Sequence, residues 1–178
     1  MRERIRKAAR SPWVRASSSG IHGRGLFARC AIPKGEKVIE YVGRVVTKAQ
    51  ADKIEEDRLA RVARGEKTSI YTFILNSRYD IDGDVSWNPA RLANHSCNPN
   101  CEALLDRGHI WIFALRDIEP GEEITYDYRF DWNLCLDHPC RCGGKDCVGF
   151  ILRKDLRWRL RRHLARKQDG AAAQAKGA

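Results

Sequence analysis

The polar segment at residues 91–100 constrains the fold of this chain more than any other feature of its sequence. It reads Arg-Leu-Ala-Asn-His-Ser-Cys-Asn-Pro-Asn. Asn and Ser side chains compete with helix and sheet for backbone hydrogen bonds, and Pro99 removes a donor, so the segment favours a loop. Apolar runs follow at residues 103–105 and 110–115, which indicates that this loop lies against a core. Because buried polar groups need partners, we expect its side chains to bind one another, a ligand or a metal.

The length of the chain and the absence of a long apolar run indicate a single soluble domain. At 178 residues the chain can bury a stable core, and its hydrophobic fraction of 43% is ordinary for a globular protein. The basic residues 1–10 are not followed by the apolar stretch of a secretory signal. No run approaches the ~20 apolar residues of a membrane span. We therefore expect a soluble, intracellular protein.

The net charge of +10 is concentrated at the two ends of the chain. Residues 1–10 carry +4 and residues 153–167 carry +7, whereas residues 11–152 carry only −1. Basic ends of this kind either stay solvated or meet nucleic acid or an acidic partner, and the sequence leaves both interpretations open.

Four of the seven cysteines lie in residues 135–147, and this clustering predicts a metal site. Clustered cysteines in an intracellular chain indicate metal binding before disulfides. Cys140, Cys142 and Cys147 lie within eight residues and are separated by two glycines, so their sulfurs can converge on one zinc ion. A structural zinc ion needs a fourth ligand. The candidates for it are Cys97, Cys101, Cys135, His138 and Cys30.

The remaining pattern predicts many short strands and few helices. Thr47 and Gln50 form a capping box that starts a helix ending near residue 64. The inner face of this helix is predicted to comprise Ala51, Ile54, Leu59 and Val62. An amphipathic C-terminal helix is predicted by leucines that recur every four residues, at Leu152, Leu156, Leu160 and Leu164. Strands are predicted at residues 37–42, 69–75, 79–82, 111–115 and 122–128.

Four separated motifs resemble, in their order, those of the SET-domain protein-lysine methyltransferases. They are His22-Gly-Arg-Gly-Leu-Phe27, the segment from Arg91 to Cys97, Gly121-Glu-Glu-Ile-Thr-Tyr-Asp-Tyr128, and a post-SET cluster of the form Cys-x-Cys-x4-Cys. Each motif is modest by itself, and the Gly-x-Gly of the first would otherwise be interpreted as a turn. The ordered set is highly specific, and the resemblance covers roughly residues 15–152.

The resemblance implies a mainly β fold with few helices, namely a SET-type β-clip of small sheets. It includes a pseudoknot, in which the Asn94-His95 segment passes through a loop formed by the last strand. A C-terminal post-SET zinc segment and a helix follow. The implied division is a basic N-terminal arm at 1–14, a SET domain at 15–130, a post-SET zinc segment at 131–152, a basic amphipathic helix at 153–167 and a flexible tail at 168–178.

The resemblance also implies ligands and roles for individual residues. It implies S-adenosylmethionine as the methyl donor and one structural zinc ion. Tyr128 matches the family's catalytic tyrosine, Tyr71 the tyrosine that lines the lysine channel, and Tyr126 the position that governs how many methyl groups are added. The implied donor-binding residues are Gly23, Arg24, Gly25, Tyr71, Asn94, His95, Tyr128, Phe150 and Leu152. The implied zinc ligands are Cys97, Cys140, Cys142 and Cys147.

The chemistry of lysine methylation agrees with these residue types. A lysine amine has a pKa of ~10.4 and becomes a nucleophile only after it loses a proton. A narrow channel walled by Tyr71, Tyr126 and Tyr128 would disfavour the ammonium form and fix the approach of the amine to the methyl group. We therefore expect an S-adenosylmethionine-dependent protein-lysine N-methyltransferase. Tyr126, rather than Phe, favours mono- or dimethylation.

The sequence constrains the substrate and the cellular setting less tightly. Seven acidic residues against one arginine in residues 117–137 predict either an acidic rim that attracts a basic protein such as a histone, or an ordinary solvated edge. The alternative function is a non-catalytic module, cross-linked by zinc, that binds chromatin or another protein through its basic ends. The expected location is nuclear or chromatin-associated in a eukaryote or a host cell, and cytoplasmic in a bacterium.

Overall fold

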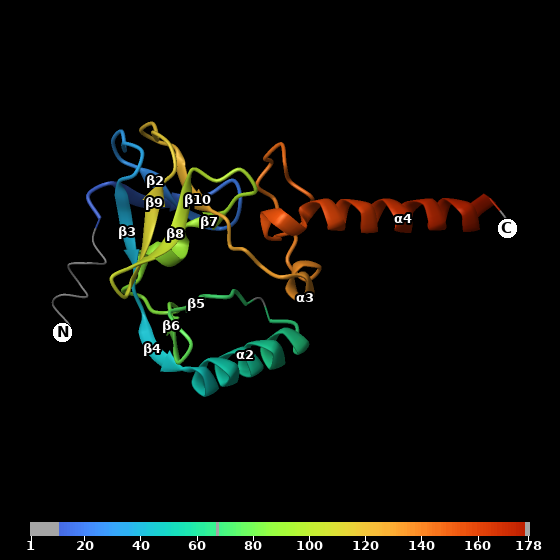
Figure 1. Cartoon of the computed structure of the whole chain (residues 1–178), viewed down its shortest axis with the longest axis horizontal. Coiled ribbons are helices and arrows are strands. Elements are labelled where there is room, and N and C mark those ends of the chain that lie inside the picture. Colours follow the sequence, from blue (N-terminus) through green and yellow to red (C-terminus); the bar gives the residue numbers. More distant parts are fainter. Residues whose placement is uncertain (1–10, 67, 177–178) are drawn as a thin grey trace.

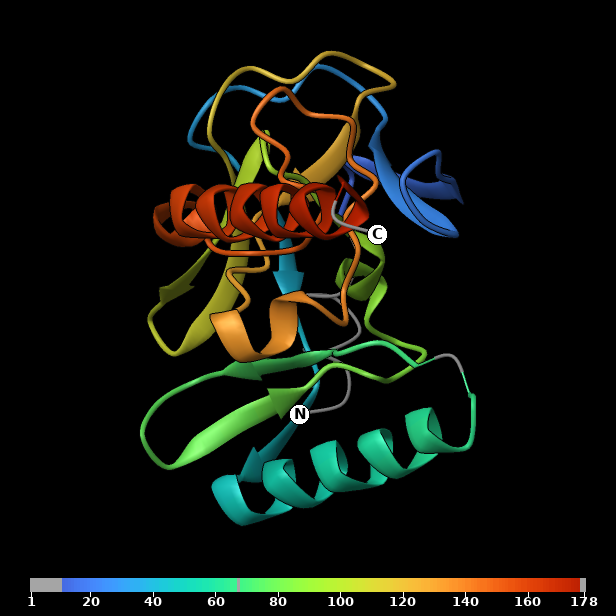
Figure 2. The same ribbon diagram turned by 90° about the vertical axis from the view of Figure 1, so that its right-hand side faces the viewer.

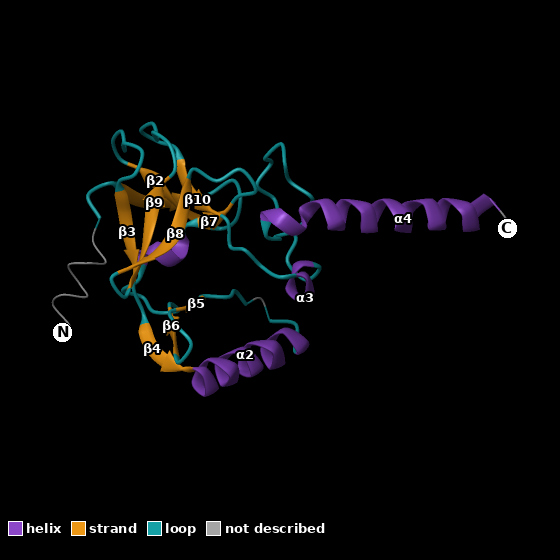
Figure 3. Cartoon of the chain, in the orientation of Figure 1, coloured by secondary structure: helices purple, strands orange, loops and turns teal. Residues whose placement is uncertain are grey.

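Three small sheets form the body of the protein (Figures 1 and 3) in a computed structural model that describes residues 11–66 and 68–176. One sheet has the order β1-β2-β10-β7, made of Val14–Ser18, Arg24–Ala28, Glu123–Tyr126 and Asn94–His95. A second has the order β3-β9-β8, made of Lys37–Tyr41, His109–Ala114 and Cys101–Asp106. The third has the order β4-β6-β5, made of Arg44–Thr47, Tyr79–Asp82 and Thr72–Ile74. The mainly β architecture of small sheets is thus confirmed, whereas most of the predicted basic arm at 1–14 lies outside the described residues.

The central core lies between the first two sheets, because their strands alternate apolar and polar residues. In β9, Ile110, Ile112 and Ala114 are buried, and the residues between them are partly exposed. Leu26 of β2 and Ile124 of β10 pack into the same cluster. This core forms the rigid support on which the polar loop at 94–100 rests.

The strand β7 pairs with β10 in parallel, whereas the other named strand pairs are antiparallel. The register places Asn94 opposite Thr125 and His95 opposite Tyr126. This pairing brings together the two segments that the predicted pseudoknot joins. Its consequence is that the polar loop lies directly beside the segment that ends in Tyr128.

Helix α2 (Lys48–Ala63) begins with the predicted capping box, since Gln50 N donates to Thr47 Oγ1 and Thr47 N donates to Gln50 Oε1. The predicted buried face of α2 extends too far toward the C-terminal end of the helix. Leu59 and Val62 are 51% and 46% exposed. The reason is that α2 packs on β4 and β6, whose strands of four residues are too short to cover a helix of 16 residues (Figure 2).

A second, smaller core joins the C-terminal segments. It contains Cys135 from α3 (Trp132–Cys135), Leu152, and Leu160 from α4 (Arg157–Lys176), with Leu156 and Leu164 packed against it. The four leucines share this core, but only Leu160 and Leu164 lie in α4, because the helix begins after Leu152 and Leu156. The short 3₁₀ turn η2 (Lys154–Leu156) precedes α4, which then extends into the predicted tail and projects away from the sheets (Figure 1).

The 3₁₀ turn η1 (Pro89–Leu92) leads directly into β7. Within the part of the chain that is described, we find no helix with the length and apolar character needed to cross a bilayer.

Candidate active site and metal centre

A cleft of about 570 Å³ opens where three segments meet. They are the loop around Gly23 (the glycine loop), the polar loop, and the C-terminal segment at residues 138–151. This volume is typical of a small-molecule site. Its lining includes six of the predicted donor-binding residues: Gly23, Arg24, Tyr71, Asn94, His95 and Tyr128. The cleft therefore brings together motifs that are about 100 residues apart in the sequence.

The side chain of Asn94 anchors the glycine loop to the sheet. Its Nδ2 lies 2.7 Å from Glu123 Oε1 and 3.1 Å from both Ser19 Oγ and the carbonyl oxygen of Arg24. The Ser19 hydroxyl in turn donates to the Glu123 carboxylate at 2.8 Å. These contacts fix the backbone of the loop beside the cleft, so Asn94 acts on the loop as well as lining the cavity.

The two loop glycines serve different purposes. Gly23 has a φ of +49°, a left-handed conformation that residues with a Cβ rarely adopt. Gly25 lies in β2 and is not among the residues that line the cleft, but a Cβ there would overlap the Glu123 carboxylate and lie 2.8 Å from its Cδ. Gly25 thus leaves space for the carboxylate that holds the loop.

Aromatic rings form one wall of the cleft and continue into the core. The Tyr128 ring centroid lies 4.9 Å from Tyr126, 5.4 Å from His95 and 5.8 Å from Phe130. Tyr126 is only 6% exposed and lies behind Tyr128, so it is not among the residues that line the cleft. Tyr71 faces the same cleft from the segment that precedes β5.

The phenols of this wall are held in their neutral form. Burial raises the pKa of Tyr126 and of Tyr128, and the neighbouring tyrosines raise each of them further. The Tyr128 hydroxyl donates a hydrogen bond to the carbonyl oxygen of Ala93 at 2.9 Å. At neutral pH these side chains therefore offer hydroxyl groups and ring faces, and no negative charge.

Four cysteine sulfurs form a compact metal-binding group. The Sγ atoms of Cys97, Cys140, Cys142 and Cys147 all lie within 4.8 Å of one another. Four thiolates are a donor set that structural zinc takes, so these residues fit the ion. The predicted choice of Cys97 as the fourth member agrees with this geometry. The other four candidates lie outside the group.

The surroundings of the cluster favour a thiolate at Cys97, whereas the hydrogen bond with Cys97 and burial raise the pKa of Cys140. The amides of Cys97 and Gly144 point at Cys142 Sγ, at 3.3 and 3.5 Å. The pKa of Cys97 is lowered to about 3, chiefly by a hydrogen bond from the Cys140 thiol and further by His95 and Arg157. Because Tyr128 N donates to His95 Nδ1, the neutral ring carries its hydrogen on Nε2, which lies 3.5 Å from Cys97 Sγ.

Besides Gly25, two further predicted donor-binding residues, Phe150 and Leu152, do not line the cleft. Leu152 is fully buried in the second core, and Phe150 packs against that core and pairs with Pro139. Ile151, between them, lines the cleft instead. The chain there is extended, so residue 151 faces the opposite side from its two neighbours.

Two residues that were not predicted, Phe130 and His138, also line the cleft, and their rings lie 4.9 Å apart. A signal existed for Phe130, because it follows Tyr128 at the two-residue spacing that puts side chains on one face of an extended chain. For His138, which was considered only as a zinc ligand, the sequence carried no such signal.

Some carboxylates of the predicted acidic rim at 117–137 are engaged within the chain. Glu122 pairs with Arg116 at 2.6 Å, and Asp131 pairs with Arg153 at 3.1 Å. Glu123 holds the glycine loop through Asn94. These contacts account for part of the excess of carboxylates, and the acidic rim stays a prediction.

Known proteins resemble most of this chain. Residues 23–129 match the family model described as SET domain. "Histone-lysine N-methyltransferase trithorax" of Drosophila virilis is 39% identical over 157 residues, which cover 85% of this chain and 4% of that protein. "Histone-lysine N-methyltransferase 2B" of Homo sapiens is 40% identical over 156 residues, covering 85% of this chain and 6% of that protein.

A fungal relative gives the same picture. "Histone-lysine N-methyltransferase, H3 lysine-4 specific" of Emericella nidulans is 41% identical over 144 residues, which cover 78% of this chain and 12% of that protein. The chain thus spans about a tenth or less of the length of these curated relatives.

Proposed function

The chain belongs to the SET-domain family, and we propose that it is a protein-lysine N-methyltransferase that takes its methyl group from S-adenosylmethionine. One observation carries the proposal: Tyr128, Tyr71, Asn94 and the glycine loop line a single cleft of about 570 Å³. The names of the relatives are consistent with it.

The cleft suits the donor in size and in the chemistry of its lining. S-adenosylmethionine supplies a methyl group attached to a sulfonium cation. Backbone groups of Gly23 and Arg24 would hold its polar end, next to Asn94 and His95. The rings of Phe130 and His138 offer an apolar face to its adenine. Phe150 and Leu152 would then act by supporting Ile151 from behind.

The tyrosine wall would prepare the lysine for attack. A channel bounded by Tyr71 and Tyr128, with Tyr126 behind Tyr128, removes water from the amine and so favours its neutral form. The proton leaves to solvent, because phenols with raised pKa values are unsuited to serve as anionic bases. The amine lone pair then bonds to the methyl carbon while the carbon–sulfur bond breaks and its electrons stay on sulfur. The residues contribute by positioning, and ring faces stabilise the cation.

We propose that the zinc ion is structural. It would connect Cys97, two residues after His95 on one side of the cleft, to the segment 140–147 on the other side. The ion is not needed at the methyl group, and its four ligands leave no open position for catalysis.

We propose a basic protein, such as a histone tail, as the substrate, and a location at chromatin. Support comes from the relatives, whose names specify histone lysine. Residues 68–71 also line a second cleft of about 400 Å³ beside α2, so Tyr71 lies between two openings. A lysine could enter from one side while the donor occupies the other.

A methylation assay with a matched pair of variants tests the proposed function. Labelled donor is incubated with histones and with lysate proteins, using the wild-type chain, Tyr128→Phe and Tyr79→Phe. Tyr79 is an exposed residue of β6 outside the cleft. We expect Tyr128→Phe to lose at least 100-fold in rate while it still binds donor, and Tyr79→Phe to match the wild type. Absence of methyl transfer and of donor binding by the wild-type chain would exclude the proposal.

A second candidate function, nucleic-acid binding, is favoured by the outer face of α4. Trp158 is 57% exposed, and Arg162 lies over its ring at 5.9 Å. Arg161, Arg162 and Arg166 are exposed on the same side of the helix. Cations grouped around an exposed aromatic ring suit phosphates and bases. Fluorescence anisotropy with labelled DNA should show binding that weakens steeply with salt, and that Arg162→Gln weakens further. Salt-independent or undetectable binding would rule this out.

A further inference from the structure

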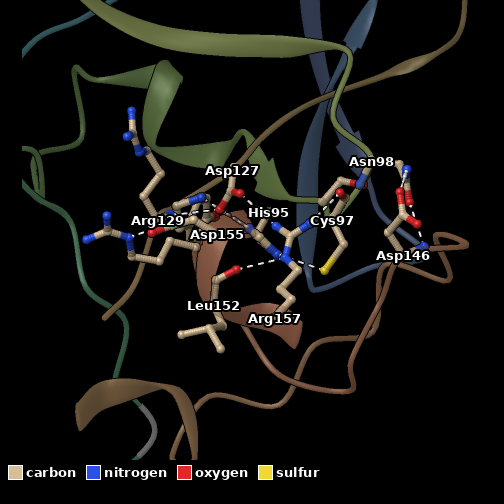
Figure 4. A network of polar contacts seen from close by, with 12 residues as sticks. His95, Cys97, Asn98, Asp127, Arg129, Asp146, Leu152, Asp155 and Arg157 are labelled. Carbon is tan, nitrogen blue, oxygen red and sulfur yellow. Dashed lines mark hydrogen bonds and ion pairs between the residues drawn. The ribbon is translucent and has the colours of Figure 1, made fainter. Parts of the chain in front are cut away.

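Arg157, the first residue of α4, is a buried arginine with three partners from separate segments. Only 4% of it is exposed. Its guanidinium donates to the carbonyl oxygen of Leu152 at 2.9 Å, to the carbonyl oxygen of Cys97 at 2.7 Å and to Asp127 Oδ2 at 2.6 Å. Figure 4 shows the guanidinium between these groups. The planar fork of arginine can satisfy all three at once, which the single ammonium of lysine does less well.

Two partners of Arg157 belong to different parts of the candidate site, and the third, Leu152, belongs to the second core. Cys97 is a member of the thiol cluster. Asp127 lies between Tyr126 and Tyr128 in the sequence, and its Oδ1 is 3.7 Å from His95 Nδ1. That same nitrogen accepts the hydrogen bond from Tyr128 N at 3.1 Å. Because His95 Nδ1 is an acceptor here, its approach to Asp127 Oδ1 is not a hydrogen bond. The guanidinium reaches His95 through Asp127 and the backbone of the adjacent Tyr128, and both His95 and Tyr128 line the cleft.

We propose that Arg157 is a positioning residue of the methyl-transfer site, and that the start of α4 is consequently part of the site although it lies beyond the residues that match the SET-domain model. The inference rests on the proposed function. Arg157 acts through Asp127 and the Cys97 carbonyl, which fix the polar loop against the segment carrying Tyr128. Without the guanidinium, these acceptors are left buried and unpaired, and the loop loses its fixed relation to the tyrosine wall.

The surface residue Arg153 provides a matched control. It precedes Arg157 by four residues and pairs with Asp131 at 3.1 Å and with Asp155 at 2.8 Å, but its side chain is 40% exposed. Exposed ion pairs contribute little. The same replacement at both positions therefore distinguishes two effects. One is the removal of a buried arginine linked to the site, and the other is the removal of an exposed arginine with two ion pairs.

The experiment compares Arg157→Met, Arg157→Lys and Arg153→Met in the full chain, loaded with zinc. Calorimetry gives the Kd for S-adenosylhomocysteine, and kinetics give kcat and KM, at a temperature where near-ultraviolet circular dichroism is native. We expect Arg157→Met to weaken binding at least tenfold and to lower kcat, Arg157→Lys to fall between it and the wild type, and Arg153→Met to stay within twofold. A purely structural role would lower Tm and leave Kd and kcat of the folded protein unchanged.

A double variant tests whether Arg157 acts through Asp127. Asp127→Asn should weaken binding in the wild type but change it less than twofold in the Arg157→Met background. If Arg157→Met does not fold, Arg157→Lys and Asp127→Asn decide, since wild-type Kd and kcat in both would overturn the inference. Wild-type values in Arg157→Met would also overturn it. Failure of the wild-type chain to bind S-adenosylhomocysteine would instead refute the proposed function itself.

Discussion

Replacement of Gly83 by alanine should disturb the proposed lysine channel from outside the cleft. A Cβ at Gly83 would overlap the hydroxyl of Tyr41 and lie 2.5 Å from its Cζ. Tyr41 is buried, and its ring centroid lies 4.5 Å from that of Phe73, so the ring has little room to retreat. Its hydroxyl donates to the carbonyl oxygen of Tyr71 at 2.7 Å. Any shift of Tyr41 is therefore transmitted to Tyr71.

The expected cost has two contributions. Overpacking a well-packed core typically costs about 1–3 kcal/mol. Loss of the Tyr41–Tyr71 hydrogen bond leaves a buried hydroxyl unpaired, at a further cost of about 1–3 kcal/mol. Together they predict a loss of about 4 kcal/mol in the free energy of unfolding. For a chain of this size, that loss corresponds to a fall in Tm of roughly 8–16 °C.

Calorimetry of Gly83→Ala beside Gly20→Ala provides the assay, since a Cβ at Gly20 meets no atom within 4 Å. We expect Gly20→Ala to keep the wild-type Tm within about 2 °C. In a Tyr41→Phe background the hydroxyl clash and the hydrogen bond are both absent, so Gly83→Ala should cost about 1–2 kcal/mol less there. Equal Tm values for Gly83→Ala and Gly20→Ala would refute the packing argument, as would strict additivity with Tyr41→Phe.

Three further predictions follow from the site. Tyr126→Phe removes a buried hydroxyl beside Tyr128 and should raise the methylation state of the product, whereas an unchanged product pattern by mass spectrometry would contradict this. Cys142→Ser should lower bound zinc from about one per chain and weaken donor binding, while the exposed Cys30→Ser should leave both intact in metal analysis and calorimetry. Burial raises the pKa of Tyr41, so above about pH 10 the folded chain keeps a proton that the unfolded chain releases. The free energy of unfolding should therefore fall as the pH rises above about 10. In denaturant titrations, Tyr41→Phe should reduce the slope of that fall by ~1.4 kcal/mol per pH unit.

The sequence predicts well the features that depend on neighbouring residues. The capping box of α2 needs only Thr47 and Gln50, three residues apart, and the structure contains it. The exposure of Leu59 and Val62 was not predictable in the same way. It depends on how far β4 and β6 extend beneath the helix, which the helical periodicity does not encode.

In the candidate metal centre, three ligands are predictable from local sequence and the fourth depends on the tertiary fold. The spacing of Cys140, Cys142 and Cys147 indicates a metal, because three thiols separated by glycines can converge without help from the rest of the fold. The fourth ligand stays undecided among five candidates at that level. Cys97 joins the cluster only because β7 and β10 pair in parallel and bring the polar loop beneath the C-terminal segment.

Arg157 marks the point where composition misleads most. Residues 153–167 hold eight lysines and arginines, and a charge count treats all of them as one solvated or binding surface. Periodicity distinguishes Arg157, because it precedes Leu160 by three positions and Leu164 by seven and thus belongs to the apolar face. An arginine on a buried face requires an acceptor, since an unpaired buried charge is costly. The sequence therefore predicts that Arg157 has a buried partner. The identity of that partner as Asp127, 30 residues earlier, depends on tertiary structure, namely the pairing of β7 with β10 and the packing of α4 against these two strands.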